Sequence, residues 1–184
     1  YSHNHADQTH GINDLRSFYI QNKKPINIFA DKPTLLYLKK NFSYCFTTNK
    51  EYPAILKLNN INKNFFIKNF NKKIDIRAVK VHHGKLKSIC YIINKKLAYI
   101  SDVSKILSND FRYFKNLEYL IIDCLWYKYH PSHFNLDTAL YMVKIFKPKR
   151  TILTNLHTDL DYNELKKRLP RNVTPAYDGL SVRL

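Results

Sequence analysis

The sequence has no long apolar run and few cysteines, and both absences narrow the class of protein. Its 184 residues contain no stretch of about eighteen consecutive apolar residues, which a membrane-spanning helix requires. The cysteines are three, an odd number, and Cys45, Cys90 and Cys124 lie far apart within apolar segments. These features argue against a disulfide framework and favour reduced, buried thiols in a cytoplasmic protein without a membrane partner.

Acidic residues are also scarce, with 14 Asp and Glu against 31 Lys and Arg and a formal net charge of +17. Such a charge predicts an anionic partner, nucleic acid included. The lysines are nevertheless scattered among Asn, Ile, Tyr and Phe, and the sequence has no arginine-rich stripe and no basic block beyond pairs such as Lys39-Lys40. The charge therefore favours anionic substrates in general and does not select RNA.

Segments with helix and strand periodicity alternate along the chain, as in a layered α/β protein. Hydrophobic residues make up 45% of the sequence, which is enough for one domain with a core. Strands are expected at residues 25–30, 65–82 (with clear alternation over 74–81), 88–93, 97–100, 119–124 and 150–153. Helices are expected over residues 31–38, over 136–146 behind the N-cap Asn135, and over 161–169 behind a capping box of Asp161 and Glu164.

The strongest signal for function is the polar stretch at the beginning of the sequence, which places His3, His5, Asp7 and His10 before Gly11. Neutral imidazoles and carboxylates are the ligands that borderline divalent cations such as zinc prefer. Two histidines separated by one residue can reach one metal ion from a tight loop, and the carboxylate two positions later can face a second. The alternative is a surface loop rich in histidine, but matching ligand types recur downstream.

This stretch resembles the His-x-His-x-Asp-His motif of the metallo-β-lactamase superfamily. With Ala6, residues 10–12 and residues 14–16, its extended form is similar to the branch related to the phosphoribosyl cyclic phosphate phosphodiesterase of phosphonate breakdown. The resemblance covers the whole chain and implies an α/β (α+β) fold, the αββα sandwich, as a single domain over residues 1–184. Because family members carry several strands before this motif, which here begins at once after Tyr1, we expect the domain to lack its N-terminal strands.

The resemblance also implies ligands for two divalent metal ions, zinc or manganese. The first ion would be held by His3, His5 and His83. The second would be held by Asp7, Asp102 and His157, with Asp102 bridging both ions. The three downstream residues each follow an expected strand, where loops can present ligands.

The sequence leaves alternatives open for these downstream residues. Asp102 is also suited to cap a following helix. Asp159 and Asp161 compete with His157 for the role of ligand, although Asp161 suits a helix cap better. His82 should point away from the ligand histidine that follows it in an extended strand, and a structural or supporting role is favoured for it.

The sequence departs from the family motif at Gln8, where the motif has its third histidine. An amide oxygen is a neutral and weaker ligand than imidazole for zinc, though it suits harder cations such as manganese. Three outcomes follow from this change: a retuned two-metal site, a one-metal enzyme, or an inactive relative. His10 is a candidate to compensate, but the resemblance implies that the branch already carries a histidine there.

Another histidine pair, His130 and His133, follows the expected strand at residues 119–124. The resemblance places an active-site histidine at His133, which could bind a phosphate oxygen or protonate a leaving alkoxide. The alternative for His133 is helix capping or packing, and His130 is expected to be structural. Arg16 is a candidate phosphate contact, with anchoring of its loop through Asp14 as the alternative.

Together these residues predict metal-dependent hydrolysis of a small phosphodiester, cyclic or linear. Bound metal ions lower the pKa of a coordinated water to about 7, Asp7 would orient the nucleophile, and His133 would assist the leaving oxygen. One alternative is an RNA-processing nuclease like tRNase Z, although the sequence has no insertion resembling the flexible basic arm of those enzymes. Another is a catalytically weakened metal-binding relative, because of Gln8. The expected partner is a small anionic phosphodiester, nucleic acid is not favoured, and a homodimer is compatible with the sequence.

Overall fold

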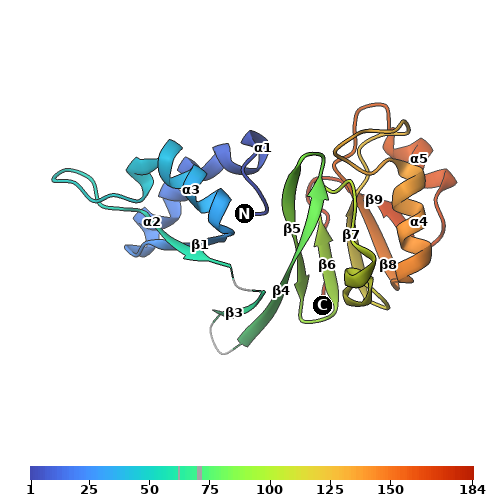
Figure 1. The fold of residues 1–184 in the computed structure, drawn as a ribbon, viewed down its shortest axis with the longest axis horizontal. Helices are drawn as coiled ribbons and strands as arrows, with labels where there is room; N and C mark the ends of the chain where they lie inside the picture. Colours follow the sequence, from blue (N-terminus) through green and yellow to red (C-terminus); the bar gives the residue numbers. More distant parts are fainter. Residues whose placement is uncertain (62, 70–71) are drawn as a thin grey trace. The chain divides into compact units, whose positions relative to one another are not determined.

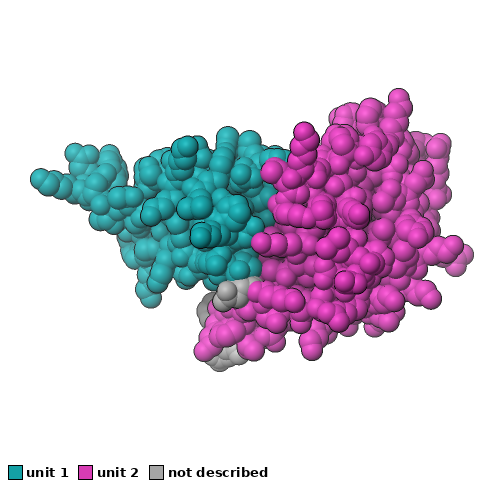
Figure 2. Space-filling model, viewed as in Figure 1, with its two compact units in different colours: residues 1–62 teal, residues 63–184 magenta. Residues whose placement is uncertain are grey.

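The computed structural model describes residues 1–61, 63–69 and 72–184 (Figure 1). The chain divides into two compact units, residues 1–62 and residues 63–184, which Figure 2 shows in different colours. Each unit has its own cluster of buried hydrophobic residues and is described by itself. The expectation of a single domain over residues 1–184 stays a prediction.

Unit 1 combines short helices with a pair of strands. Its elements are α1 (Ala6–Thr9), the 3-10 helix η1 (His10–Leu15), α2 (Arg16–Asn22), β1 (Ile26–Ala30), α3 (Lys32–Asn41), the 3-10 helix η2 (Ser43–Cys45) and β2 (Leu56–Asn60). β1 and β2 pair in parallel, and Ile28 of β1, Leu38 of α3 and Leu56 of β2 share one buried cluster. α3 begins where the sequence predicted, because the side chain of Asp31 accepts a hydrogen bond from the backbone N–H of Thr34 at 3.2 Å.

Unit 2 is built on a seven-stranded sheet, within the described residues, whose strands follow one another in sequence order. The strands are β3 (Asn64–Asn69), β4 (Lys72–His83), β5 (Leu86–Ile93), β6 (Leu97–Ile100), β7 (Tyr119–Asp123), β8 (Arg150–Thr154) and β9 (Val173–Pro175). The other elements of unit 2 are the 3-10 helix η3 (Ser108–Tyr113), α4 (Leu136–Phe146) and α5 (Tyr162–Arg168). Pairing is antiparallel from β3 to β6 and parallel from β6 to β9.

The core of unit 2 lies where the sheet packs against α4, which runs alongside the parallel strands (Figure 1). Val81 of β4 and Ile122 of β7 share the buried cluster with Ala139, Val143 and Phe146 of α4. The spacing of these three residues puts them on one face of the helix. Burial of the Phe146 side chain contributes about 2 kcal/mol to folding.

The strands and helices of unit 2 that short sequence patterns predicted are confirmed by the structure. The expected segment 65–82 forms β3 and β4, and residues 70 and 71 between them lie outside the described residues. Ile93 and Leu97 pair across a tight turn in which Asn94 and Lys95 adopt left-handed φ angles of 50° and 55°. Among the described helices none is long and apolar enough to cross a bilayer.

Candidate metal centre

Four of the expected site residues of unit 2 lie at one edge of its sheet. β4, β6, β7 and β8 run in the same direction, so their C-terminal ends meet at that edge. His83 is the last residue of β4, Asp102 follows β6, and His157 follows β8. His133 comes from the loop between β7 and α4. The topology therefore explains why residues far apart in the sequence reach the same place.

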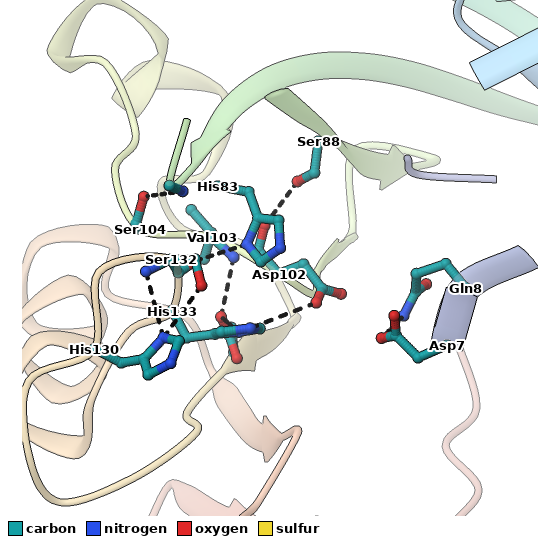
Figure 3. A network of polar contacts seen from close by, with 12 residues as sticks. Asp7, Gln8, His83, Ser88, Asp102, Val103, Ser104, His130, Ser132 and His133 are labelled. Atoms are coloured by element: carbon teal, nitrogen blue, oxygen red, sulfur yellow. Dashed lines mark hydrogen bonds and ion pairs between the residues drawn. The ribbon is translucent and has the colours of Figure 1, made fainter. Parts of the chain in front are cut away.

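A compact cluster forms at this edge from His83, Asp102 and His133 (Figure 3). One ligand atom from each of the three residues lies within 4.8 Å of the other two. Nε2 of His133 is 3.9 Å from Oδ1 of Asp102, and the rings of His83 and His133 meet edge to face with centroids 4.7 Å apart. Two imidazoles and a carboxylate at such distances are a donor set that suits a divalent cation.

His83 is held in the orientation that a metal ligand needs. Its Nδ1 lies 2.7 Å from the backbone carbonyl oxygen of Ser132. A neutral imidazole that donates from Nδ1 to a carbonyl carries its lone pair on Nε2. This is the arrangement in which a histidine ligand is fixed by the residues behind it.

Asp102 has features that a bound cation would explain. Its side chain is buried, and within the described part of the chain its Oδ2 has no hydrogen-bond partner. Its φ is 49°, a strained value for a residue other than glycine. No helix begins at Val103 among the described residues, so the alternative role of Asp102 as a helix cap is not seen. A buried carboxylate oxygen without a partner is costly, and a cation at this position would remove the cost.

Asp123, which the sequence analysis did not single out, holds His133 in place. Its Oδ2 accepts hydrogen bonds from Nδ1 of His133 at 2.8 Å and from the backbone N–H of Val103 at 2.9 Å. Burial raises the pKa of the Asp123 carboxyl, while the hydrogen bond and charge of His133 and the Val103 N–H oppose this rise. The available signal was an acidic residue ending a fully apolar strand, where a buried carboxylate needs a partner.

His157 lies outside the compact cluster, in an environment of its own. Its side chain is 48% exposed, its Nδ1 is 3.5 Å from Oδ1 of Asp159, and its ring lies 5.4 Å from that of Trp126. Trp126 in turn donates a hydrogen bond from Nε1 to Oδ2 of Asp159 at 2.6 Å. The role of His157 as a metal ligand stays a prediction.

The two remaining histidines of unit 2, His82 and His130, contact residues outside the compact cluster. His82 contacts the ammonium group of Lys87, with Nε2 at 2.6 Å, and desolvation, Lys87 and Lys105 all lower its pKa. His130 is 3.1 Å from the hydroxyl of Ser132 through its Nδ1, so it braces the loop that carries His133. Neither belongs to the compact cluster.

Unit 1 carries the motif at the beginning of the chain. The rings of His3 and His5 meet edge to face with centroids 4.5 Å apart, and Nδ1 of the buried His3 lies 3.0 Å from the hydroxyl of Ser2. Gln8 points its amide nitrogen at Asp7, donating a hydrogen bond to Oδ2 at 3.2 Å. Burial raises the pKa of Asp7, but this hydrogen bond, the backbone N–H of Asp7 and the charges of His3 and His5 outweigh it and lower the pKa overall.

His10 and Arg16 lie apart from that motif within unit 1. Nε2 of His10 is 3.4 Å from the hydroxyl of Tyr37, and its ring packs edge to face on Phe42. This contact engages His10 with α3 instead of the ligand residues. Arg16 begins α2, and the described residues show no ion pair between it and Asp14. Its predicted contact with a phosphate stays a prediction.

Comparison with known proteins adds a family and a fold. The pattern of the beta-lactamase superfamily domain matches residues 1–155. No curated protein matches the chain. A diphosphatase from the PhnP family is 28% identical with a TM-score of 0.87, and the match covers 100% of this chain and 70% of that one.

Two further solved structures have the same architecture at lower identity. The metallo-β-lactamase-fold protein YhfI from Bacillus subtilis is 16% identical with a TM-score of 0.74, over 97% of this chain and 74% of that one. The short form of human tRNase Z is 16% identical with a TM-score of 0.69, over 100% of this chain and 78% of that one. At such identities the likeness establishes the fold alone.

Proposed function

The chain belongs to the β-lactamase superfamily, and from this membership we propose that it is a metal-dependent hydrolase acting on a small phosphodiester. Its predicted fold class, an α/β protein of the metallo-β-lactamase type, is confirmed by the solved structures that resemble it. The observation that carries the proposal is the cluster of the buried His83 and Asp102 with the half-buried His133, in which the Oδ2 of Asp102 has no partner among the described residues.

His83 and Asp102 of this cluster fit a divalent cation, zinc or manganese, while His133 is assigned to proton transfer. The proposed ligands are the set implied by the sequence: His3, His5, Asp7, Gln8, His83, Asp102 and His157. When bound, the metal ions polarise the phosphate and activate the attacking water. The amide of Gln8 is the weakest of these ligands for zinc. Binding of the second metal ion is therefore the part of the proposal that depends most on this residue.

The other chemistry comes from side chains of the protein. Asp7 has a lowered pKa, so it is ionised at neutral pH and can accept a hydrogen bond that orients the nucleophile. His133 receives its orientation from Asp123 through Nδ1, and its Nε2 lies 3.9 Å from Oδ1 of the proposed ligand Asp102. From there a protonated His133 gives its proton to the leaving alkoxide. Arg16 is proposed as a phosphate contact.

The PhnP-family relative supports the proposed class of substrate. A diphosphatase that is 28% identical over the whole of this chain favours a substrate with phosphate ester or anhydride bonds. The net charge of +17 favours the same class, because it attracts anions from solution. The charge is also the observation that keeps RNA as the second candidate substrate.

Hydrolysis of 2′,3′-cyclic AMP, a small cyclic phosphodiester whose leaving group is an alkoxide, tests the proposal. We expect activity to disappear on treatment with EDTA and to return when zinc or manganese is added. His133→Ala should lower kcat by at least about a hundredfold, the contribution of a general acid. His82→Ala is the matched control and should stay within about twofold of the wild type, since His82 lies outside the cluster.

Full activity of the EDTA-treated protein, or of His133→Ala, would contradict the proposal. Gln8→His addresses the third possibility raised by the sequence, a weakened enzyme. We expect this variant to bind more zinc per chain by elemental analysis and to gain activity. A loss of activity would instead identify a site already adapted to the amide.

A further inference from the structure

Unit 2 contains a cavity that lies away from the candidate metal centre. Its volume is about 430 Å3, and its lining comes from the start of β3, the first half of β4, the end of β5 with the turn to β6, and the segment that contains η3. Arg77 lines this cavity and stands six residues before His83 on the same strand, which corresponds to about 20 Å of extended chain. The cavity is therefore separate from the cluster at the other end of the sheet.

The cationic side chains of this cavity are concentrated around one tyrosine. The guanidinium carbons of Arg77 and Arg112 lie 4.4 Å and 4.9 Å from the ring centroid of Tyr113, and Arg112 also donates a hydrogen bond to its hydroxyl at 2.9 Å. Neither guanidinium has a carboxylate partner among the described residues. Cation–π contacts hold the two planar groups in place while their N–H donors remain able to bind an oxyanion.

The charge balance of the lining favours an anion with several negative charges. Besides the two arginines, Lys95 and Lys115 line the cavity, against the single carboxylate of Asp75. Four cations and one anion leave the lining with a net charge of +3. Asp75 is itself 2.8 Å from Lys73, which further reduces its effect.

The wall that carries Asp75 is tied to the turn that carries Lys95. The backbone N–H of Asp75 donates to the side-chain oxygen of Asn94 at 2.9 Å, and the backbone N–H of Asn94 donates to the carbonyl of Asp75 at 2.8 Å. These reciprocal bonds fix the β5–β6 turn against β4. Two walls of the cavity are thus held together by hydrogen bonds of the backbone.

The rest of the lining is the polar Asn64 and an apolar group of Phe65, Ile76, Ile92 and Leu117. An inorganic phosphate would leave this surface unused, whereas a ligand with a flat apolar part beside its phosphates would cover it. A run of single-stranded RNA would need several aromatic faces for stacking, but besides Phe65 the described lining has only Tyr113, whose ring is already contacted by two guanidinium groups. The volume falls within the range of ordinary small-molecule sites.

We propose that this cavity is a binding site for a nucleoside diphosphate. The diphosphate binds Arg77, Arg112, Lys95 and Lys115, and the base lies against the apolar residues. Guanidinium groups suit phosphate because they offer two parallel N–H donors. The site requires no metal ligand of the chain and is independent of the hydrolase proposal.

Isothermal titration calorimetry with ADP on the complete chain, in EDTA and without magnesium, tests this site. We expect one ADP per chain, with adenosine and pyrophosphate each binding at least tenfold more weakly. R77Q/R112Q should weaken ADP binding at least tenfold. K95Q/K115Q changes exposed residues that contribute little to folding, and it should weaken binding at least threefold. Because EDTA removes metal ions, failure of the hydrolase proposal leaves this measurement unaffected.

Arg150→Gln is the matched control. Arg150 also lies over a tyrosine ring, 6.0 Å from the centroid of Tyr119, but outside the cavity, and its replacement should leave ADP binding unchanged. Equal weakening by R150Q and by a cavity variant would show a nonspecific charge effect and overturn the proposal. It would also be overturned by absence of ADP binding, by pyrophosphate binding as tightly as ADP, or by binding of an oligoribonucleotide but not of ADP.

Discussion

At the scale of single residues, the buried carboxylate of Asp123 determines how His133 is presented. One oxygen of Asp123 accepts hydrogen bonds both from the His133 ring and from the backbone of Val103, the residue after Asp102. It therefore couples the orientation of the proposed acid to that of the proposed ligand. Its other oxygen is buried without a partner among the described residues, so a change at this position has little room for compensation.

Asp123→Asn is expected to lower kcat for phosphodiester hydrolysis by about ten- to a hundredfold, the usual effect of removing a group that orients a functional histidine. The reason is that the amide is neutral, so it stabilises a protonated His133 less than the carboxylate does, and its NH2 group is left at the buried position where Oδ1 has no partner among the described residues. Steady-state kinetics on 2′,3′-cyclic AMP measure the effect. Asp137→Asn, an exposed change of the same charge, is the control, and equal activities of the two variants would contradict the prediction.

The three cysteines give a second prediction at this scale. Cys45, Cys90 and Cys124 are completely buried. Burial raises the pKa of each thiol, well above its usual value for Cys90 and to about 12 for Cys124, and the charge of Asp123 adds to the effect at these two residues. At pH 8 a thiol with that pKa is ionised in only about one molecule in ten thousand, and the thiolate is the reactive form. We expect none of the three to react rapidly with a chromogenic disulfide reagent until denaturant is added. A rapid reaction of the native protein would show that a cysteine is accessible.

At the scale of elements, α4 links the core of unit 2 to the loop that carries His133. Asn135 begins the helix by accepting a hydrogen bond from the backbone N–H of Thr138 at 3.0 Å, and its amide reaches the carbonyl of Tyr127 at 3.3 Å. The same residue thus fixes the helix start and one end of the preceding loop. Its neighbour Phe134 is buried, which holds the loop from the other side.

Asn135→Ala is expected to lower the free energy of unfolding by about 1 kcal/mol, the typical loss of an N-cap. Urea denaturation followed by circular dichroism measures the change. Asn135→Asp keeps the acceptor and adds a favourable charge at the helix N-terminus, so it should lose less. A loss of stability in the aspartate variant equal to that in the alanine variant would show that the contact with Tyr127 is the important one.

The elements that the sequence predicted are those whose signals are local. α4 with its cap at Asn135, the turn at Asn94 and the apolar strand β7 all follow from short patterns of residues. β2 has a polar second half and forms through pairing with β1, so its pattern alone did not indicate a strand. The capping box was correct at Asp161, but the side chain of Glu164 pairs with Lys167 at 2.7 Å instead of returning to the cap.

The site residues were predictable by type and position along the chain, but their surroundings were not. The pairing of Asp123 with His133 joins residues on different elements, and the burial of one oxygen of Asp102 depends on the whole sheet edge. Such facts come from tertiary packing, which periodicity does not contain. The same reason explains why the cavity around Tyr113 had no signal in the sequence, since its arginines come from β4 and η3.

At the scale of the whole molecule, the two units differ in the size of their sheets and of their buried hydrophobic clusters. Unit 2 contains the seven-stranded sheet and the larger buried cluster, with α4 packed into it. Unit 1 has a two-stranded sheet and a smaller cluster, and a pair of strands is marginal without further packing. Stability should therefore be concentrated in residues 63–184.

We expect a fragment of residues 63–184 to fold on its own and to unfold cooperatively in urea, because its core is formed within the unit. Trp126, the only tryptophan of the sequence, lies in this fragment and reports the transition by fluorescence. Phe146→Ala in the fragment should lower its free energy of unfolding by about 3 to 5 kcal/mol, the cost of removing a large buried side chain, which shows that the transition reports the packed core. A fragment without a cooperative transition would mean that residues 1–62 are required for folding, as the prediction of a single domain over residues 1–184 implies.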